Sequence, residues 1–449
     1  MKKTIIQLSD HFNFQRLLGF TFPSIIMMVF TSIYGVVDGF FVSNYVGKTP
    51  FAAVNFIMPL LIILGCAGFM FGTGGSALIA KNMGEGNMKK ANELFSLIVY
   101  AAVACGILLM VLGLIFIRPV ALLMGAKGQL LEDSVLYGNI ILIAQPFFIL
   151  QYEFQCLFAT AEKPKFGLYV TVASGVTNMI LDAIFVAIFH WGLVGAAAAT
   201  AFSQFVGGVI PLIYFARKNS SQLQLGTCKF DGRALLKTCT NGSSELMSSI
   251  SASVVGMLYN IQLMKYAGEN GVAAYGVLMY VSMIFQAIFI GYSVGGAPIV
   301  GYHYGAQNYD ELKNLRKKSI ILINIFSILM FMAGQILAKP LSLIFVSYDR
   351  ELLEMTIHAF TIFSFSFLLS GFSIFSSSFF TALNDGLTSA LISFLRTMVF
   401  QSSTVMIFPM FWALDGIWIL DLCQYFRQKK LKDYAAFLSS SSSFCCGVR

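Results

Sequence analysis

The sequence predicts an all-α integral membrane protein made of two six-helix bundles, related by a pseudo-two-fold axis along the membrane normal. Two observations predict this fold class. First, 57% of the 449 residues are hydrophobic and only 11% are charged, whereas soluble domains average about 25% charged residues. Second, the apolar residues form long runs, and the second half of the chain repeats the pattern of the first. A helix of about 20 residues crosses a bilayer core, so each run is long enough to span it.

Twelve membrane spans are expected, of which the last is doubtful. The first covers residues 21–47, and the others of the first half lie near 51–79, 93–117, 133–158, 166–189 and 193–216. The runs of the second half lie near 241–265, 271–299, 319–337, 355–381 and 387–411, and the twelfth begins at 412. Basic residues gather in alternate loops. The positive-inside rule therefore predicts that both termini are cytoplasmic, provided that all twelve spans form.

A polar connection at 217–238 divides the chain into two predicted lobes. The N-lobe is 1–216 with spans one to six, and the C-lobe is 239–420 with spans seven to eleven and the start of the twelfth. Residues 421–449 follow as an atypical polar tail. The connection holds five basic residues and is the longest hydrophilic segment between the spans, so we expect it to be a cytoplasmic loop.

The second half repeats the first at a constant shift of 221 residues. The matching positions are mostly glycine, proline and tryptophan, and include Gly47 with Gly268, Gly84 with Gly305, Pro119 with Pro340, and Trp191 with Trp412. Each repeat has six spans, an even number, so both repeats share one topology. Repeats of this kind are related by an axis along the membrane normal and are typical of transporters, with the substrate path between the repeats.

Asp38 lies in the middle of the first span, two helical turns from any polar flank. A carboxylate inside hydrocarbon is costly, and such residues usually face a protein interior or a water-filled cavity and serve function. The alternative is a protonated aspartate that hydrogen-bonds to a neighbouring helix for packing alone. The convergence of other polar residues in the same half favours function.

The fifth span supplies these polar residues. Asn178 and Asp182 are four residues apart, which places them on one helical face, and Thr200 in span six offers a hydroxyl group. Together with Asp38 they can hold a proton or coordinate Na⁺ through carboxylate, amide and hydroxyl oxygens. The repeat partners of the acidic pair are Tyr259 and Ser403. The predicted site therefore belongs to the first half only.

Other candidates are more ambiguous. Glu245, near the start of span seven, can line a substrate cavity or simply extend to the cytoplasmic interface. Glu153 in span four and Arg396 in span eleven leave similar alternatives open. The sequence 291–295 fits the GxSxG pattern of hydrolases, but it lies in a membrane span rather than on a strand-to-helix turn. The repeat partner of Ser293 is Gly72, which suits close helix packing.

Cofactor chemistry finds little support in the sequence. The eight cysteines form no CxxC or CxxH pair, so neither a disulfide framework nor a zinc site is indicated. No Gly-Lys-Ser/Thr follows the glycines at 84–86, so these residues are no nucleotide-binding loop. We expect no cofactor and no metal beyond Na⁺ at Asp38, Asn178 and Asp182, with an ion gradient as the energy source.

Over residues 14–420 the chain resembles the multidrug and toxic compound extrusion (MATE) family, prokaryotic type. The resemblance rests on the 6+6 organisation, on Pro23 and Asp38 in span one, and on the paired loops 84–87 and 305–308. Asn178, Asp182 and Thr200 resemble the cation site in the N-lobe of prokaryotic members.

The resemblance implies export of bulky, often cationic compounds by alternating access, driven by entry of Na⁺ or H⁺. It also implies that Tyr34 lines the same cavity as Asp38, and that Pro23 acts as a hinge when Asp38 changes state. Glu245 resembles the acidic residue of span seven that some members use. The implied partners are small organic cations or drugs and membrane lipid, without nucleic acid. A monomer in the bacterial inner membrane, with a cytoplasmic N-terminus, is expected.

The tail departs from this pattern. Residues 196–215 contain no charged side chain, whereas the aligned residues 417–436 contain six, beginning at Asp421. Each buried charge costs about 2.5–3.5 kcal/mol at mid-membrane, so we expect no native twelfth span beyond about residue 420.

A non-functional, truncated transporter is therefore one alternative function. A flippase for lipid-linked sugars or polysaccharides is another. A membrane enzyme ranks last, because the four histidines are dispersed.

Overall fold

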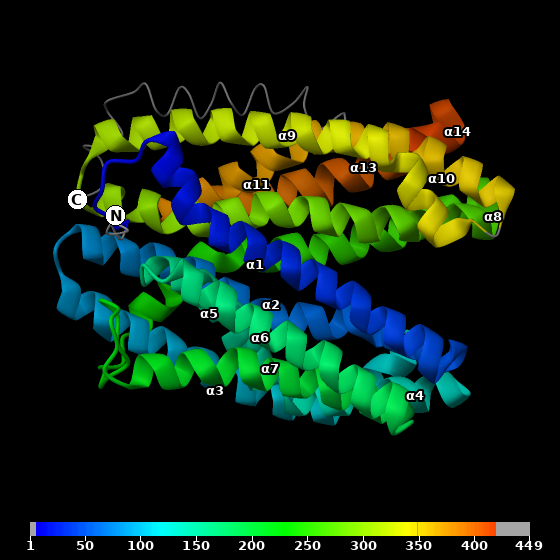
Figure 1. The fold of residues 1–449 in the computed structure, drawn as a ribbon, viewed down its shortest axis with the longest axis horizontal. Helices are drawn as coiled ribbons and strands as arrows, with labels where there is room; N and C mark the ends of the chain where they lie inside the picture. Colours follow the sequence, from blue (N-terminus) through cyan, green and yellow to red (C-terminus); the bar gives the residue numbers. More distant parts are fainter. Residues whose placement is uncertain (1–5, 348, 419–449) are drawn as a thin grey trace. The chain divides into compact units, whose positions relative to one another are not determined.

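The computed structural model describes residues 6–347 and 349–418, and all regular structure in these residues is helical (Figure 1). This confirms the predicted all-α fold class. The chain separates into two compact units: the first comprises Met1–Ser253, Met283–Leu322 and Ile374–Phe394, and the second comprises Val254–Ser282, Ile323–Ser373 and Leu395–Arg449. The predicted lobes follow the sequence repeat, and their boundaries stay a prediction.

Seven helices open the first unit. They are α1 (Phe14–Phe41), α2 (Lys48–Gly84), α3 (Met88–Leu123), α4 (Gly128–Ile143), α5 (Gln145–Thr160), α6 (Pro164–Asp182) and α7 (Gly192–Ala216). Helix α2 packs against α3, α4 and α5, while α6 packs between α1 and α7. Two short π-helical segments, η1 (Val42–Val46) and η2 (Ala183–Ile188), continue α1 and α6.

The remaining elements begin with the long helix α8 (Gly232–Gly305), which starts inside the segment predicted to be a loop. They continue with α9 (Tyr309–Val346), α10 (Arg350–Phe363), η3 (Ser364–Ser366), α11 (Phe367–Ala382), α12 (Gly386–Phe394), η4 (Leu395–Gln401), α13 (Ser402–Ile407) and α14 (Pro409–Trp418). A kink at Gly268, where φ is 61°, divides α8 into two spans. Glycine adopts this left-handed conformation without strain from a Cβ atom.

Within the described residues, ten helices are long and apolar enough to cross a membrane, or eleven if the bent pair α4 and α5 counts as one span. The axes of this pair differ by 59°, and the two helices together cover the predicted span 133–158. All eleven expected spans before the doubtful twelfth are therefore present. The twelfth span and the tail at 421–449 lie outside the described residues, apart from the first residues of the span in α14.

Glycines bring α2 and α8 together in the first unit. A Cβ atom on Gly84 would meet the backbone oxygen of Tyr302, and one on Gly305 would meet the backbone oxygen of Lys81. These two contacts exchange under the 221-residue shift, because residue 84 maps onto 305 and residue 81 onto 302. A two-fold axis between the repeats produces such pairs of equivalent contacts, because the contact of residue i with j is matched by one of j with i.

The second unit has its own polar contacts. Gln335 of α9 donates hydrogen bonds from Nε2 to the Thr361 backbone oxygen (2.9 Å) and to Ser364 Oγ (2.7 Å). A Cβ atom on Gly334 would lie 2.7 Å from Ser364 Cβ, so the two helices approach closely here. The candidate site residues, however, lie in the first unit.

Candidate functional site

Helix α1 carries the central residue of the predicted site. Its N-terminus is capped by Asn13, whose side-chain oxygen accepts from the Arg16 amide at 2.8 Å. Pro23 lies inside the helix and is buried. Because proline has no N–H, the helix loses the bond that residue 23 would donate to the backbone of Gly19. Asp38 lies four turns further on and is 8% exposed.

Helix α8 meets α1 beside this proline. A Cβ atom on Gly291 would lie 2.5 Å from Ile25 Cα, and one on Gly295 would lie 3.1 Å from Thr21 Cα. The glycines of the rejected GxSxG motif therefore serve close helix packing. The contact lies at the point of α1 where the hydrogen-bond ladder is interrupted.

The residues predicted to join Asp38 do so in the structure. Helix α6 packs against α1 and contributes Asn178 (1% exposed) and Asp182 (0% exposed). From α7, Thr200 Oγ1 donates a hydrogen bond to Asp38 Oδ1 at 3.3 Å. Asp38 also interacts electrostatically with Asn178 and Asp182. Three helices thus bring two carboxyl groups, one amide and one hydroxyl together in the protein interior.

Several oxygens of this cluster lack protein donors. Asn178 Oδ1 and both carboxyl oxygens of Asp182 have no hydrogen-bond partner among the described residues. An ionised carboxylate buried without a partner is strongly unfavourable, so the group needs a proton or a cation. The donor set consists of oxygens, which suits a proton or a hard cation such as Na⁺. The described residues contain no group of three or more His, Cys, Asp and Glu side chains that could hold a metal ion.

Tyr34 lies one turn before Asp38 on α1 and contacts α5 and α6. Its hydroxyl accepts a hydrogen bond from Gln151 Nε2 at 3.5 Å, and the same amide donates to Ser174 Oγ at 3.4 Å. A Cβ atom on Gly175 would lie 2.9 Å from the Tyr34 ring. The polar layer next to Asp38 thus links α1, α5 and α6.

Tyr137 of α4 lies next to the candidate site, and sequence analysis did not identify it. It is completely buried, and its hydroxyl has no hydrogen-bond partner in the described part of the chain. The phenol lies within electrostatic reach of Asp38 and Asp182 and close to the Thr200 hydroxyl. A single tyrosine in a chain with 18 of them carries no sequence signal. Only the packing of α4 against α7 brings it to the site.

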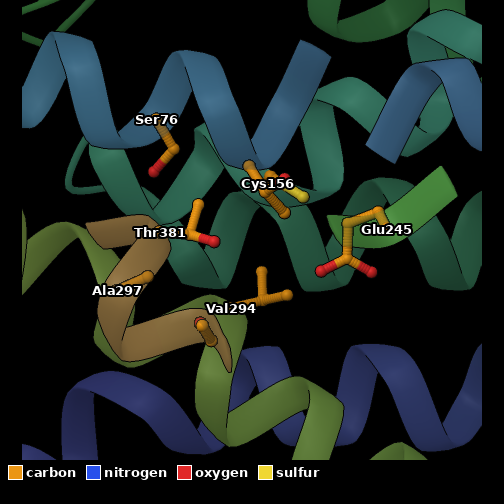
Figure 2. A pocket seen from close by; sticks show the side chains of 8 residues that line it. Ser76, Cys156, Glu245, Val294, Ala297 and Thr381 are labelled. Carbon is orange, nitrogen blue, oxygen red and sulfur yellow. The ribbon is translucent and has the colours of Figure 1, made fainter. Parts of the chain in front are cut away.

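Glu245 lies in a different hollow of the first unit, shown in Figure 2. The hollow is lined by Thr73, Ser76, Cys156, Glu245, Val294, Ala297, Ser378 and Thr381. Its volume is about 10 Å³, which is room for about one water molecule. Thr73 with Val294 and Ser76 with Ala297 are repeat partners, so related positions of the two repeats face one hollow. Tyr34 is not among the lining residues, and a shared substrate cavity for Tyr34 and Glu245 stays a prediction.

The two helices that carry Asp38 and Asp182 change from α-helical to π-helical geometry shortly after these residues. Segment η2 begins at the residue after Asp182, and η1 begins four residues after Asp38. The two segments contact each other. Single π-helical turns are rare in proteins and frequently lie at functional sites, so this feature marks the same end of α1 and α6 that carries the carboxyl groups.

Comparison with known proteins identifies the family. The MatE family model matches residues 23–184 and 246–406. The multidrug export protein MepA of Staphylococcus aureus (strain MRSA252) is 24% identical over 409 residues, which cover 91% of this chain and 90% of the relative. MepA of Staphylococcus haemolyticus (strain JCSC1435) is 24% identical over 412 residues, again with 91% and 90% covered.

Solved structures share the fold. The outward-facing conformation of a multidrug resistance MATE family transporter has a TM-score of 0.87 at 21% identity, covering 96% of this chain and 100% of that chain. A MOP superfamily transporter from Pyrococcus furiosus has a TM-score of 0.87 at 21% identity, covering 94% and 95%. The family match extends over most of the chain and both repeats. The chain therefore belongs to the MatE family, and it is a multi-pass membrane transporter rather than an enzyme.

Proposed function

We propose that the chain is a secondary active multidrug efflux antiporter of the bacterial cell membrane. It exports bulky, often cationic compounds in exchange for H⁺ or Na⁺ by alternating access. The curated relatives are named multidrug export proteins, which supports the substrate class. The observation that carries the ion coupling is the burial of Asp38 and Asp182 together, on different helices, with Asn178 and Thr200 beside them.

The proposed coupling follows from the cost of burying charge. Asp38 and Asp182 cannot both remain ionised in the protein interior without a counter-charge, because both carboxyl groups are buried. A proton or Na⁺ held between them removes that cost and allows α1 and α6 to pack closely. Loss of the ion restores the repulsion and favours a conformation in which the carboxyl groups reach water.

Pro23 is the proposed hinge of this movement. The missing hydrogen bond at Pro23 makes α1 easier to bend there than elsewhere. The backbone of α1 at Ser24 and Ile25 lies against Gly291 and Gly295 of α8. A bend driven by Asp38 therefore changes a contact with the second repeat. Two similar solved structures are described as MATE in the bent conformation and MATE in the straight conformation.

The substrate groups in this proposal are Tyr34 and Glu245. An aromatic ring attracts an organic cation through its π-electrons, and a carboxylate contributes the complementary charge. The flippase alternative is not favoured, because the curated relatives are named for multidrug export. A monomer that contacts membrane lipid, with its N-terminus in the cytoplasm, completes the proposal. The alternative of a truncated, inactive transporter depends on residues outside the described part of the chain.

Vesicles with an imposed pH or Na⁺ gradient provide the test. Asp38→Asn and Asp182→Asn should each abolish gradient-driven efflux of a fluorescent organic cation while the protein remains folded in the membrane. Glu132→Gln removes an exposed carboxylate on α4 and should transport normally. Which of the two gradients drives the wild-type protein identifies the ion. Near-normal efflux in both aspartate variants would show that the coupling site is elsewhere.

A further inference from the structure

A second hollow in the first unit lies where three membrane-spanning helices begin or end. Its volume is about 250 Å³, and it is lined by Leu78, Asn82, Lys90, Leu94, Asp231, Arg233, Ala234 and Lys237. The spans Thr49–Gly84, Met88–Leu123 and Gly232–Gly268 contribute these residues through the ends of α2, α3 and α8. The hollow therefore lies at the boundary of the apolar spans, the level of the lipid headgroups.

The charge of this hollow is positive. Lys90, Arg233 and Lys237 provide three cations against the single carboxylate of Asp231. Asp231 already has two partners: its Oδ1 accepts from the Ala234 amide at 3.0 Å, and its Oδ2 pairs with Lys90 Nζ at 3.1 Å. The Ala234 amide, together with the Lys90 ammonium, holds the pKa of Asp231 below its usual value. The carboxylate thus stays ionised, caps α8 and orients Lys90.

Two cations of the hollow are left over. Neither Arg233 nor Lys237 forms an ion pair with any residue that the structure describes. Lys237 is also within electrostatic reach of a further cation, Lys81, and of Glu85, which is 3.6 Å from Lys81. Glu85 offsets part of this positive charge, but the three cations of the hollow still outnumber the carboxylate of Asp231, so an added anion is favourable.

Two leucines line the hollow with these cations, and two exposed apolar residues neighbour its lining residues in sequence. Leu78 and Leu94 line the hollow itself, while Phe230 is 83% exposed and Leu236 is 66% exposed on the adjoining segment. Large apolar side chains at the end of a membrane span can extend into the headgroup and acyl-chain boundary, where aromatic residues are enriched. The hollow thus combines positive charge with an apolar rim.

We propose that this hollow binds the phosphate headgroup of an anionic phospholipid. Arg233 offers the planar donor fork that matches phosphate oxygens, and Lys237 adds a second charge. Phe230 and Leu236 contact the acyl-chain region of the same lipid. Basic pockets between transmembrane helices bind anionic headgroups in this way. A bound lipid would join the end of α2 and the start of α3 to the start of α8.

The test compares two variants of equal net charge in the full-length protein. Arg233→Gln with Lys237→Gln removes the two unpaired cations of the hollow. Lys89→Gln with Lys229→Gln removes two exposed cations from the same segments, outside the hollow. Native mass spectrometry in neutral detergent measures binding of phosphatidylglycerol and of phosphatidylcholine, and thermal unfolding measures the stabilisation that each lipid gives.

Wild-type protein should bind phosphatidylglycerol in preference to phosphatidylcholine. The hollow variant should bind phosphatidylglycerol roughly 30-fold more weakly, since each cation near a membrane surface contributes about 1 kcal/mol. Each single substitution should weaken binding about 5-fold, and the control pair should stay within about two-fold of wild type. Equal losses in both double variants, or equal binding of the two lipids, would overturn the proposal. Equal stabilisation by inorganic phosphate would show that the ligand is a free anion instead.

Discussion

The buried carboxyl groups of Asp38 and Asp182 are the residues on which the proposed ion coupling depends. Asp38, Asn178, Asp182 and Thr200 could be predicted from the sequence, because a polar residue inside an apolar span is conspicuous against its neighbours. Tyr137 could not be predicted. A tyrosine is unremarkable in a membrane helix, and only the tertiary packing of α4 against α7 places its hydroxyl beside Thr200.

Tyr137→Phe should impair ion coupling without unfolding the protein. The substitution removes only a hydroxyl and keeps the buried ring. The hydroxyl has no hydrogen-bond partner among the described residues, but it lies within reach of both carboxyl groups, so it can donate to the carboxylate that loses its ion during transport. A hydrogen bond to a charged group is worth about 1.5–3 kcal/mol, so the gradient-driven efflux rate should fall about 10- to 100-fold at limiting ion concentration. Tyr169→Phe, on the 69% exposed Tyr169, is the matched control. An unchanged ion dependence in Tyr137→Phe would exclude the hydroxyl from the site.

The helices show where prediction from sequence succeeds and where it fails. Hydropathy located all eleven spans before the doubtful twelfth, since each span is a property of a continuous segment. The 59° bend between α4 and α5 and the π-helical segments η1 and η2 were not predicted. The bend coincides with Pro146 in the first turn of α5, a local signal that was overlooked, whereas η1 and η2, which contact each other, are far apart in sequence. Close packing was predicted for Gly72, the repeat partner of Ser293, because small residues let helices approach closely; a Cβ atom on Gly72 would lie 3.0 Å from Glu153 Cα of α5.

Gly305→Ala should destabilise the protein through its contact with α2. The new methyl group would meet the backbone oxygen of Lys81, which cannot move aside as a side chain can. Overpacking of this kind costs about 1–3 kcal/mol, and Gly84→Ala should cost a similar amount through Tyr302. Gly296→Ala is the control, since nothing lies within 4 Å of its Cβ position. Thermal unfolding in detergent measures all three, and equal midpoints would contradict the reciprocal contact.

At the scale of the whole chain, the internal repeat could be predicted from the sequence, whereas the contacts of the N-terminal segment 7–13 could not. The 221-residue shift predicted paired positions that the structure brings together, including Gly84 with Gly305 at the α2–α8 contact. The segment 7–13, called here the strap, gave no signal. Leu8 and Phe12 are completely buried, and the strap's partners lie about 150 and 300 residues away in sequence. The local sequence pattern of this segment contains no information on contacts with residues so far away in the sequence.

Two glutamates hold the strap in the first unit. The Leu8 amide donates to Glu162 Oε1 at 2.7 Å, beside the turn between α5 and α6. The Phe12 amide donates to Glu311 Oε1 at 2.9 Å, and His11 Nδ1 lies 2.6 Å from Glu311 Oε2. The strap thereby ties a turn of the first repeat to the start of α9 in the second.

Glu311→Gln should loosen this connection. The glutamine keeps the shape of the side chain but loses the charge that strengthens the bond from the Phe12 amide, so stability should fall by about 1.5–3 kcal/mol. Phe12→Ala should cost about 3–5 kcal/mol, because it empties a completely buried site. Asp310→Asn, on the neighbouring side chain that is 98% exposed, should have no effect. Limited proteolysis within 7–13 and thermal unfolding measure the outcome. If Glu311→Gln and Asp310→Asn leave cleavage and midpoint equally unchanged, the strap is not held by Glu311.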